Sequence, residues 1–260
     1  MSDLTEQTLC ELRDPFAVVA INRELRSNTL DFLTLRELTQ VFSDLRSNTS
    51  VRAVILTGAG DQAFSEGADV EEMGALTAEQ ARDFALAEQN LASVIEGVGK
   101  PVIAAINGAA YGAGCELASA CMWRIASATA KFGFPEISRG FFGGASRLRR
   151  IIGPSRALEM ILTGEPIGAE EALRIGLVNR VARDRKELMV VGEELAMRIS
   201  RNAPLAVKYA IEAVNRGAGR SLDDGLRLES ALFGRCFATE DAREGTRAFL
   251  EKRQPVFKGE

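Results

Sequence analysis

Hydrophobic and polar positions divide the first half of the chain into alternating strand-like and helix-like segments. Continuous apolar runs, which are typical of strands buried on both faces, occur at Val51–Leu56, Pro101–Ile106 and Trp123–Ala126. Elsewhere in this half, apolar residues recur at helical spacing in Leu30–Leu45 and Thr77–Ile95. Because parallel strands need crossover connections, this alternation predicts a mostly parallel sheet built from β-α-β units.

The two ends of the chain follow different patterns. Leu9–Arg13 and Phe16–Asn22 are predicted strands around an Asp14-Pro15 turn. Beyond residue 144 the spacing predicts helices, with one short strand near Leu177–Val181. The expected helices are Ser146–Leu162, Ala169–Ile175, Lys186–Ser200, Leu205–Val214, Leu222–Phe237 and Asp241–Lys252. No linker rich in Pro, Gly or Ser separates the halves, so we expect one α/β core with a helical C-terminal region packed on it or on a neighbouring subunit.

Composition changes this picture mainly through what it excludes. With 46% hydrophobic and 26% charged residues among 260, the chain is typical of a globular protein with its own core. The net charge of -4 gives the chain no electrostatic reason to bind nucleic acid or an anionic membrane. The sequence contains no His, which excludes Ser-His-Asp and Cys-His sites and leaves acid-base chemistry to carboxylates, Lys, Cys or Tyr.

Cysteine usage favours a reducing compartment. The chain has four cysteines, Cys10, Cys115, Cys121 and Cys236. They form no CxxC pair, and their spacing matches no metal motif or disulfide framework. The N-terminal segment is acidic and lacks the apolar stretch of a signal peptide, so we expect a cytoplasmic protein.

The apolar segment 101–123 is long enough to cross a bilayer. However, it contains Asn107, Glu116 and several glycines, and a strand-like half precedes a helix-like half. We therefore predict a buried strand-loop-helix instead of a membrane span.

Two glycine-rich stretches follow predicted strands and precede helix-compatible sequence. Phe64–Asp69 comes after Val51–Leu56, and Asn107–Gly114 comes after Pro101–Ile106. Loops at the carboxyl ends of parallel strands line the ligand crevice of an α/β sheet, and free N–H groups at a helix start suit an anion or a developing oxyanion. Tight turns are the alternative explanation for these glycines. The sequence contains neither a dinucleotide-binding nor a P-loop glycine motif in the required place.

Two glutamates stand in apolar surroundings beside these loops. Glu116 is the single charged residue of segment 101–123, and Glu136 follows Phe132-Gly133-Phe134-Pro135. Apolar surroundings raise the pKa of a carboxyl group, and two carboxyls that share a site separate each other's titration, so that one stays protonated. The alternative for each glutamate is a structural acid that caps a helix or pairs with one of the many arginines.

Four stretches of the sequence carry a resemblance to a known family. They are VRAVILTGAGDQAFSEGADVEEM, KPVIAAINGAAYGAGCELASACMWRIASATAKFGFPEISRG, ILTGEPIGAEEALRIGLVNRV and AFLEKRQPVFKG. In order and spacing, from about Leu9 to Lys258, the chain resembles the crotonase superfamily, the enoyl-CoA hydratases and isomerases.

The resemblance implies an α/β fold in which ββα units form a spiral. Residues 1–200 would form the core that carries the active site, and residues 201–260 a helical region for trimers, often paired into hexamers. It also implies an acyl-CoA substrate of fatty acid metabolism. Coenzyme A is then part of the substrate, and we expect no separate cofactor, no metal, no nucleic acid and no membrane as partners.

By position in the family motifs, two backbone N–H groups hold the thioester oxygen, those of Ala68 and Ala113. An enolate-like thioester gains several kcal/mol of stabilisation from two fixed donors in a dry site. The same comparison gives the residues expected to contact coenzyme A, which are Arg26, Ser27, Asn28, Ala68, Asp69, Val70, Glu71 and Ala113.

The resemblance also assigns roles to the two glutamates. Glu116 and Glu136 occupy both glutamate positions of the family's hydratases, so Glu116 activates the water that attacks C3 and Glu136 supplies a proton to C2. Water addition needs such a pair, one group to deprotonate water and one to protonate carbon. An isomerase that moves the double bond with a single glutamate is the alternative reaction.

Three features separate this chain from the family pattern. Ala113 replaces the usual glycine, and Glu66 stands where a small residue is commoner, which adds an unexpected charge near the entrance. The loop Gly140–Arg147 is a few residues shorter than usual and lacks its proline. That loop helps to position Glu136 and shapes the acyl pocket, so we expect it to affect chain-length preference. A further alternative is an RNA-binding relative, for which the basic cluster is Arg147, Arg149, Arg150 and Arg156.

Overall fold

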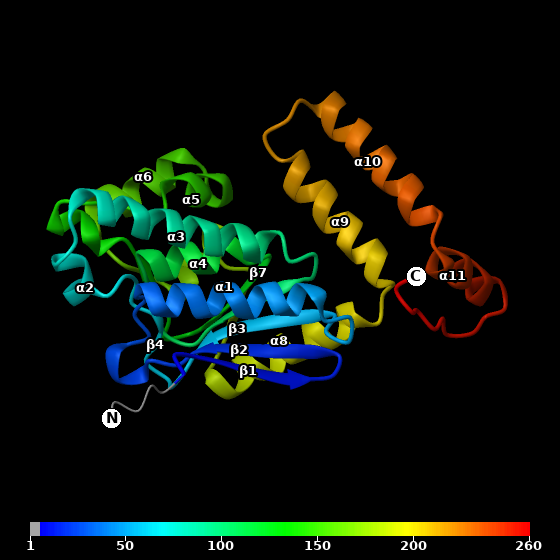
Figure 1. The fold of residues 1–260 in the computed structure, drawn as a ribbon, viewed down its shortest axis with the longest axis horizontal. Coiled ribbons are helices and arrows are strands. Elements are labelled where there is room, and N and C mark those ends of the chain that lie inside the picture. Colours follow the sequence, from blue (N-terminus) through cyan, green and yellow to red (C-terminus); the bar gives the residue numbers. More distant parts are fainter. Residues whose placement is uncertain (1–5) are drawn as a thin grey trace.

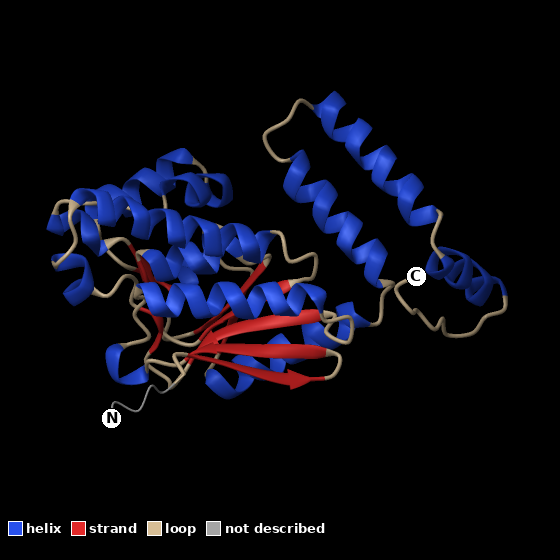
Figure 2. Cartoon of the chain, in the orientation of Figure 1, coloured by secondary structure: helices blue, strands red, loops and turns tan. Residues whose placement is uncertain are grey.

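The computed structural model describes residues 6–260, so the first residues of the N-terminal segment discussed above lie outside it. Its strands form two sheets (Figures 1 and 2). The larger sheet has the order β1 (Thr8–Arg13), β2 (Phe16–Ile21), β3 (Ala53–Gly58), β5 (Val102–Ile106), β7 (Trp123–Ser127), β10 (Arg180–Ala182). The smaller sheet has the order β4 (Ala63–Ser65), β6 (Ala109–Tyr111), β8 (Lys131–Gly133), β9 (Ile167–Gly168).

Helices follow the strands along the chain and fall into a core group and a C-terminal group. Those of the core are α1 (Phe32–Ser47), α2 (Val70–Gly74), α3 (Ala78–Glu96), α4 (Ala113–Ala120), α5 (Ala145–Ile152), α6 (Pro154–Thr163), α7 (Ala169–Arg174) and α8 (Arg185–Ser200), with 3-10 turns η1 (Glu24–Arg26) and η2 (Pro135–Arg139). The C-terminal helices are α9 (Pro204–Gly217), α10 (Leu222–Phe237) and α11 (Glu240–Leu250).

Each turn of the chain places one strand in each sheet and then adds helix. The pairs β3–β4, β5–β6 and β7–β8 follow this rule, and the neighbouring strands of successive turns are parallel. The expected spiral of ββα units is therefore confirmed, and only the β1–β2 hairpin and the β8–β9 pair are antiparallel within the described residues.

The larger sheet is buried on both faces, which explains its continuous apolar runs. Along β3, Val54 and Leu56 face the cluster that includes the buried stripes of α1 and α3, whereas Ala53 and Ile55 face α8. Figure 1 shows α1 and α3 on one side of this sheet and α8 on the other. Burial of such alternating sets is worth about 25 cal/mol for each Å² of apolar surface, and it supplies most of the driving force for folding.

The smaller sheet was not predicted, because its strands are two or three residues long and show no period of their own. The predicted helix Ser146–Leu162 is also wrong as a single element. It is two helices, α5 and α6, which meet at Gly153 with φ +79° before Pro154. A residue before proline is disfavoured in the helical region, and only glycine reaches this φ without strain.

Segment 101–123 folds as predicted into a buried strand, a loop with a short strand, and a helix, namely β5, β6 and α4. Within residues 6–260, none of the helices combines the length and the apolar character that a membrane crossing requires.

Asn107 ties the two sheets together where the chain passes from β5 to β6. Its amide nitrogen donates to the carbonyls of Gly60 (2.9 Å) and Ala63 (3.0 Å), and its amide oxygen accepts from the N–H of Gly58 (3.1 Å). The side chain is buried, so each partner would lose its hydrogen bond without gaining water.

We predict that Asn107→Ala lowers the free energy of unfolding by about 2–4 kcal/mol, measured by denaturant titration. Asn90→Ala removes the same group from an exposed position on α3 and should change stability by less than about 0.5 kcal/mol. Equal effects of the two substitutions would show that Asn107 does not hold this junction.

Candidate active site

Three loops meet at one edge of the smaller sheet because β4, β6 and β8 are parallel neighbours. Ser65 at the end of β4 pairs with Ala110, and Tyr111 at the end of β6 pairs with Gly133 at the end of β8. The residues that follow these strands must therefore lie side by side. They include Ala68, Ala113 and Glu136, which are far apart in the sequence.

The backbone N–H of Ala68 is left free by the way its loop is held. Leu30 donates its N–H to the Gly67 carbonyl and accepts from the N–H of Asp69, both at 2.8 Å. Ala68 stands between these two bonded positions, so its own N–H points away from Leu30. Ala68 also lines a cavity of about 490 Å³.

The backbone N–H of Ala113 is free for a different reason. Ala113 is the first residue of α4, and the first N–H groups of a helix have no acceptor within it. Gly67 packs directly against it, since a Cβ added to Gly67 would lie 3.4 Å from the Ala113 nitrogen. Ala113 is helical, so the alanine can present its N–H as glycine would, and it lines the same cavity as Ala68.

Glu116 lies in the first turn of α4, where two donors hold its carboxyl group. The carboxyl accepts from the Arg147 guanidinium (3.1 Å) and from the Gly144 N–H (3.0 Å). Arg147 also pairs with Glu96 at 2.8 Å, and the side chains of Glu116 and Arg147 are 15% and 18% exposed. The arginine partner considered for Glu116 is therefore present, and it holds this carboxyl group at the cavity wall.

Glu136 lies one turn of the spiral later and is held differently. It follows Pro135 at the start of η2, and the residue is only 7% exposed. Burial raises the pKa of Glu136 above its ordinary value, and the charge of Glu116 acts in the same direction. Arg139 opposes this shift. Burial therefore favours the protonated form of Glu136.

The two carboxyl groups face one another across Gly143. A Cβ added there would lie 3.5 Å from Oε1 of Glu136 and 4.0 Å from Oε2 of Glu116. Both side chains line the cavity that also contains Ala68 and Ala113. The structure thus places two backbone amide donors and two carboxyl groups with different surroundings around one cavity.

Glu88 also lines this cavity, together with Glu66, and it is an acid that sequence reasoning missed. It lies on α3, four residues after buried Phe84 and three before buried Leu91, so it occupies the inward stripe of the helix. Burial, and then the charges of Glu116 and Glu136, raise its pKa from 4.5 to about 8. An acid within an apolar stripe was the signal that could have revealed it.

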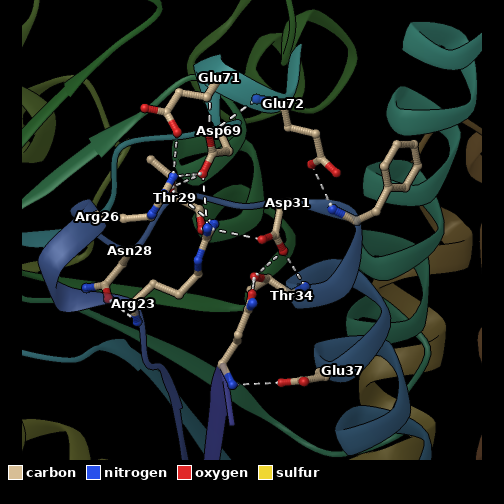
Figure 3. Close-up of polar contacts among 12 residues, drawn as sticks. Arg23, Arg26, Asn28, Thr29, Asp31, Thr34, Glu37, Asp69, Glu71 and Glu72 are labelled. Carbon is tan, nitrogen blue, oxygen red and sulfur yellow. Dashed lines mark hydrogen bonds and ion pairs between the residues drawn. The ribbon is translucent and has the colours of Figure 1, made fainter. Parts of the chain in front are cut away.

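Several of the residues expected to contact coenzyme A take part in the polar contacts that Figure 3 shows, namely Arg26, Asn28, Asp69 and Glu71. Ala68 and Val70, on either side of Asp69, line the cavity. Asp69 caps α2 by accepting from the N–H groups of Glu71 (3.1 Å) and Glu72 (3.4 Å), and it pairs with Arg23 at 3.0 Å. Arg26 contacts both Asp69 (3.3 Å) and Glu71 (2.9 Å). Its side chain is 55% exposed and remains accessible to a ligand.

Ser27 and Asn28 differ in what they can offer a ligand. Both have positive φ, 51° and 54°. The side chain of Asn28 is buried and donates to the carbonyls of Ala59 (2.9 Å) and Ala63 (2.8 Å). A contact between Asn28 and coenzyme A must therefore use its backbone, whereas Val70 presents an exposed side chain that lines the cavity.

Comparisons with known proteins agree with this geometry. The family model described as enoyl-CoA hydratase/isomerase matches residues 12–260. The chain is 44% identical to the short-chain-enoyl-CoA hydratase of Clostridium acetobutylicum, with 95% of each chain covered. The chain belongs to the enoyl-CoA hydratase/isomerase family. The crotonase resemblance drawn from the sequence is therefore confirmed.

Other family members are similar over nearly their whole length. The crotonyl-CoA hydratase of Syntrophomonas wolfei is 42% identical, with 97% of this chain and 98% of the relative covered. The crystal structure of an enoyl-CoA hydratase from Bacillus anthracis superimposes with a TM-score of 0.94 at 37% identity, covering 98% of this chain and all of the other.

Acidic residues partly neutralise the basic cluster that we considered as an RNA-binding surface. Arg147 pairs with Glu96 and Glu116, and Arg156 pairs with Glu159 at 2.7 Å. In residues 6–260, no group of three His, Cys, Asp or Glu side chains is arranged to hold a metal ion.

Because burial raises the pKa of Glu88, the pH dependence of protein stability tests that burial. A carboxyl whose folded pKa lies above the unfolded value stabilises the fold fully below the unfolded pKa, and this contribution is lost as pH rises through the folded value. For Glu88 the window runs from 4.5 to about 8. Glu88→Gln, which cannot ionise, should therefore be more stable than wild type by about 4 kcal/mol near pH 8 and by less than about 1 kcal/mol near pH 5.

Thermal unfolding at both pH values measures this difference. Glu79→Gln, an exposed glutamate on the same helix, serves as the matched control and should follow the wild-type pH dependence. A Glu88→Gln variant with the wild-type pH dependence would contradict the burial of a protonated Glu88.

Proposed function

We propose that this protein is an enoyl-CoA hydratase that adds water across the C2=C3 bond of a 2-enoyl-CoA thioester. The observation that carries the proposal is the meeting of Glu116 and Glu136, from successive turns of the spiral, across Gly143 in one cavity with two free amides. The hydratases from C. acetobutylicum and S. wolfei, which are 44% and 42% identical to this chain, support it.

In the proposed reaction, the N–H groups of Ala68 and Ala113 donate hydrogen bonds to the thioester oxygen and stabilise the enolate-like charge that develops there. Glu116, held in place by Arg147, takes a proton from the water whose oxygen forms the bond to C3. Glu136 gives its proton to C2. The product is a 3-hydroxyacyl-CoA, and the net proton balance is closed when Glu116 and Glu136 exchange a proton through solvent.

The different environments of the two acids suit this division of roles. The base must be ionised, and Glu116 accepts from a guanidinium and a backbone N–H. The acid must be protonated, and burial raises the pKa of Glu136. Hydration needs no group beyond these donors and acids, so we propose that the enzyme uses no separate cofactor and that coenzyme A belongs to the substrate.

We also propose that coenzyme A passes the network of Arg26, Ser27, Asp69 and Glu71, with the backbone of Asn28 contributing. The guanidinium of Arg26 supports this path, because it is exposed and pairs with Asp69, whose neighbours Ala68 and Val70 line the cavity. The four cysteines are free thiols, which supports a reducing, cytoplasmic setting.

Replacing either glutamate tests the reaction directly. Glu136→Gln and Glu116→Gln should each lower kcat for hydration of crotonyl-CoA by at least about a hundredfold, because each removes one proton-transfer group. The loss of enoyl-thioester absorbance measures the rate. Glu79→Gln on the exposed face of α3 should keep the wild-type rate.

A wild-type rate for Glu136→Gln would refute the role of Glu136. If the wild-type enzyme instead converts a 3-enoyl-CoA to the 2-enoyl isomer without forming a hydroxyacyl product, the reaction is isomerisation with one glutamate. The two outcomes are distinguished by analysing the products by mass, since hydration adds the mass of one water.

We propose that residues 1–200 form the catalytic core and that residues 201–260 mediate assembly into trimers or hexamers. Helices α9 and α10 pack on one another and project from the core together with α11 (Figure 1). These helices expose large apolar side chains, namely Val214, Leu222, Leu226, Phe233, Phe237, Phe249 and Leu250. Such a surface is expected to be covered by other subunits.

The proposed assembly predicts a particle mass of three or six times the 28.1 kDa of one chain, measured by light scattering. Phe233 and Phe237 stack with centroids 5.9 Å apart and are 68% and 66% exposed. Substituting Asp for both should shift the mass toward one chain, whereas Arg235→Ala on the same helix should not. A wild-type protein with the mass of one chain would contradict the assembly.

A further inference from the structure

Glu88 lies on the wall that the catalytic cavity shares with a second cavity. The catalytic cavity measures about 490 Å³ and the second about 560 Å³. Five residues line both cavities, namely Ala85, Glu88, Glu116, Phe142 and Gly143. An acyl chain that extends past Glu116 toward the second cavity therefore approaches Glu88.

The walls change in polarity at this junction. On the catalytic side the cavity is lined by apolar side chains such as Met73, Phe84 and Phe141. On the far side the lining is mainly polar, with Gln89, Ser93, Glu96, Ser146, Arg147 and Arg150. A hydrocarbon chain that passes Glu88 would leave apolar walls and meet groups that bind water more strongly.

Among residues 6–260, the groups that shift the pKa of Glu88 include no cation. Its neighbours in the cavity are the acids Glu116 and Glu136, and the nearby guanidinium of Arg147 already pairs with Glu96 and Glu116. Arg139 lines the catalytic cavity, and Arg150 the far one. Burial beside two acids raises the pKa of Glu88 to about 8, so at neutral pH it is a neutral carboxyl.

A neutral carboxyl both donates and accepts a hydrogen bond. When this carboxyl faces an uncharged hydroxyl or carbonyl group of the substrate, its hydrogen bonds are satisfied. When it faces a methyl group, it loses contact with water and has no hydrogen-bond partner, which is strongly unfavourable. A carboxylate on the substrate would instead add a second negative charge beside Glu116, whose guanidinium partner is already shared with Glu96.

We propose that Glu88 is a specificity-determining residue that selects enoyl-CoA substrates with an uncharged polar group, a hydroxyl or a carbonyl, on the acyl chain beyond C3. The proposal rests on the hydratase function proposed above, whose cavity it uses. Nothing in the reaction at C2 and C3 requires Glu88, because Glu116 and Glu136 supply both proton transfers.

A matched pair of substrates tests it. 6-Hydroxyhex-2-enoyl-CoA and hept-2-enoyl-CoA have the same length and differ by a terminal hydroxyl in place of a methyl group. Wild type should show a kcat/KM at least about tenfold higher for the hydroxylated substrate. Glu88→Leu should reverse this preference, and Glu88→Gln should retain it, because an amide also donates and accepts. If Glu88→Leu does not fold, Glu88→Met takes its place.

Crotonyl-CoA, which is too short to carry the terminal group, separates the two proposals. If wild type hydrates crotonyl-CoA but does not discriminate within the matched pair, or if Glu88→Leu keeps the wild-type preference, the role of Glu88 is wrong and the hydratase function stands. If wild type hydrates none of these substrates, the proposed function itself fails. Faster turnover of the 6-carboxylate analogue than of the 6-hydroxy substrate would overturn the choice of an uncharged group.

Discussion

The parallel pairing of β4, β6 and β8 is the constraint on which the rest of the site depends. These strands are three residues long, yet their register makes their carboxyl ends coincide. The loop after β4 presents Ala68, the helix after β6 presents Ala113 and Glu116, and the turn after β8 presents Glu136. Close contacts enforce this pairing, since a Cβ on Gly114 would lie 2.1 Å from the Ser65 carbonyl oxygen. A side chain at that position would push the first two loops apart.

Once the loops are held together, different surroundings suit Glu116 and Glu136 to different roles. Arg147 and the Gly144 N–H hydrogen-bond to Glu116, while burial raises the pKa of Glu136. Glu88 is a further carboxyl of the cavity, and burial shifts its pKa in the same direction. The amide donors beside these acids suit a thioester that becomes anionic only as it reacts.

The larger sheet and most helices could be predicted from the sequence. Strands that are buried on both faces consist of continuous apolar runs, and helices that are buried on one face carry apolar residues at helical spacing. The smaller sheet could not, since strands such as Ala63–Ser65 are too short to show a period. The glutamates were found through a family resemblance and their apolar setting. The pairing of Arg147 with Glu116 could not be predicted, because the two residues are 31 positions apart in the sequence and meet only in the fold. Glu88 was overlooked although it occupies a buried stripe of its helix.

A crystal structure of the assembled protein with a saturated acyl-CoA, such as butyryl-CoA, tests the shared cavity most directly. We expect the thioester oxygen to lie about 2.7–3.1 Å from the nitrogens of both Ala68 and Ala113. We also expect the carboxyl of Glu136 to face C2 and that of Glu116 to face C3. A thioester bound away from these amides, or with one of these carboxyls turned from the acyl carbons, would contradict a site built from adjoining turns of the spiral.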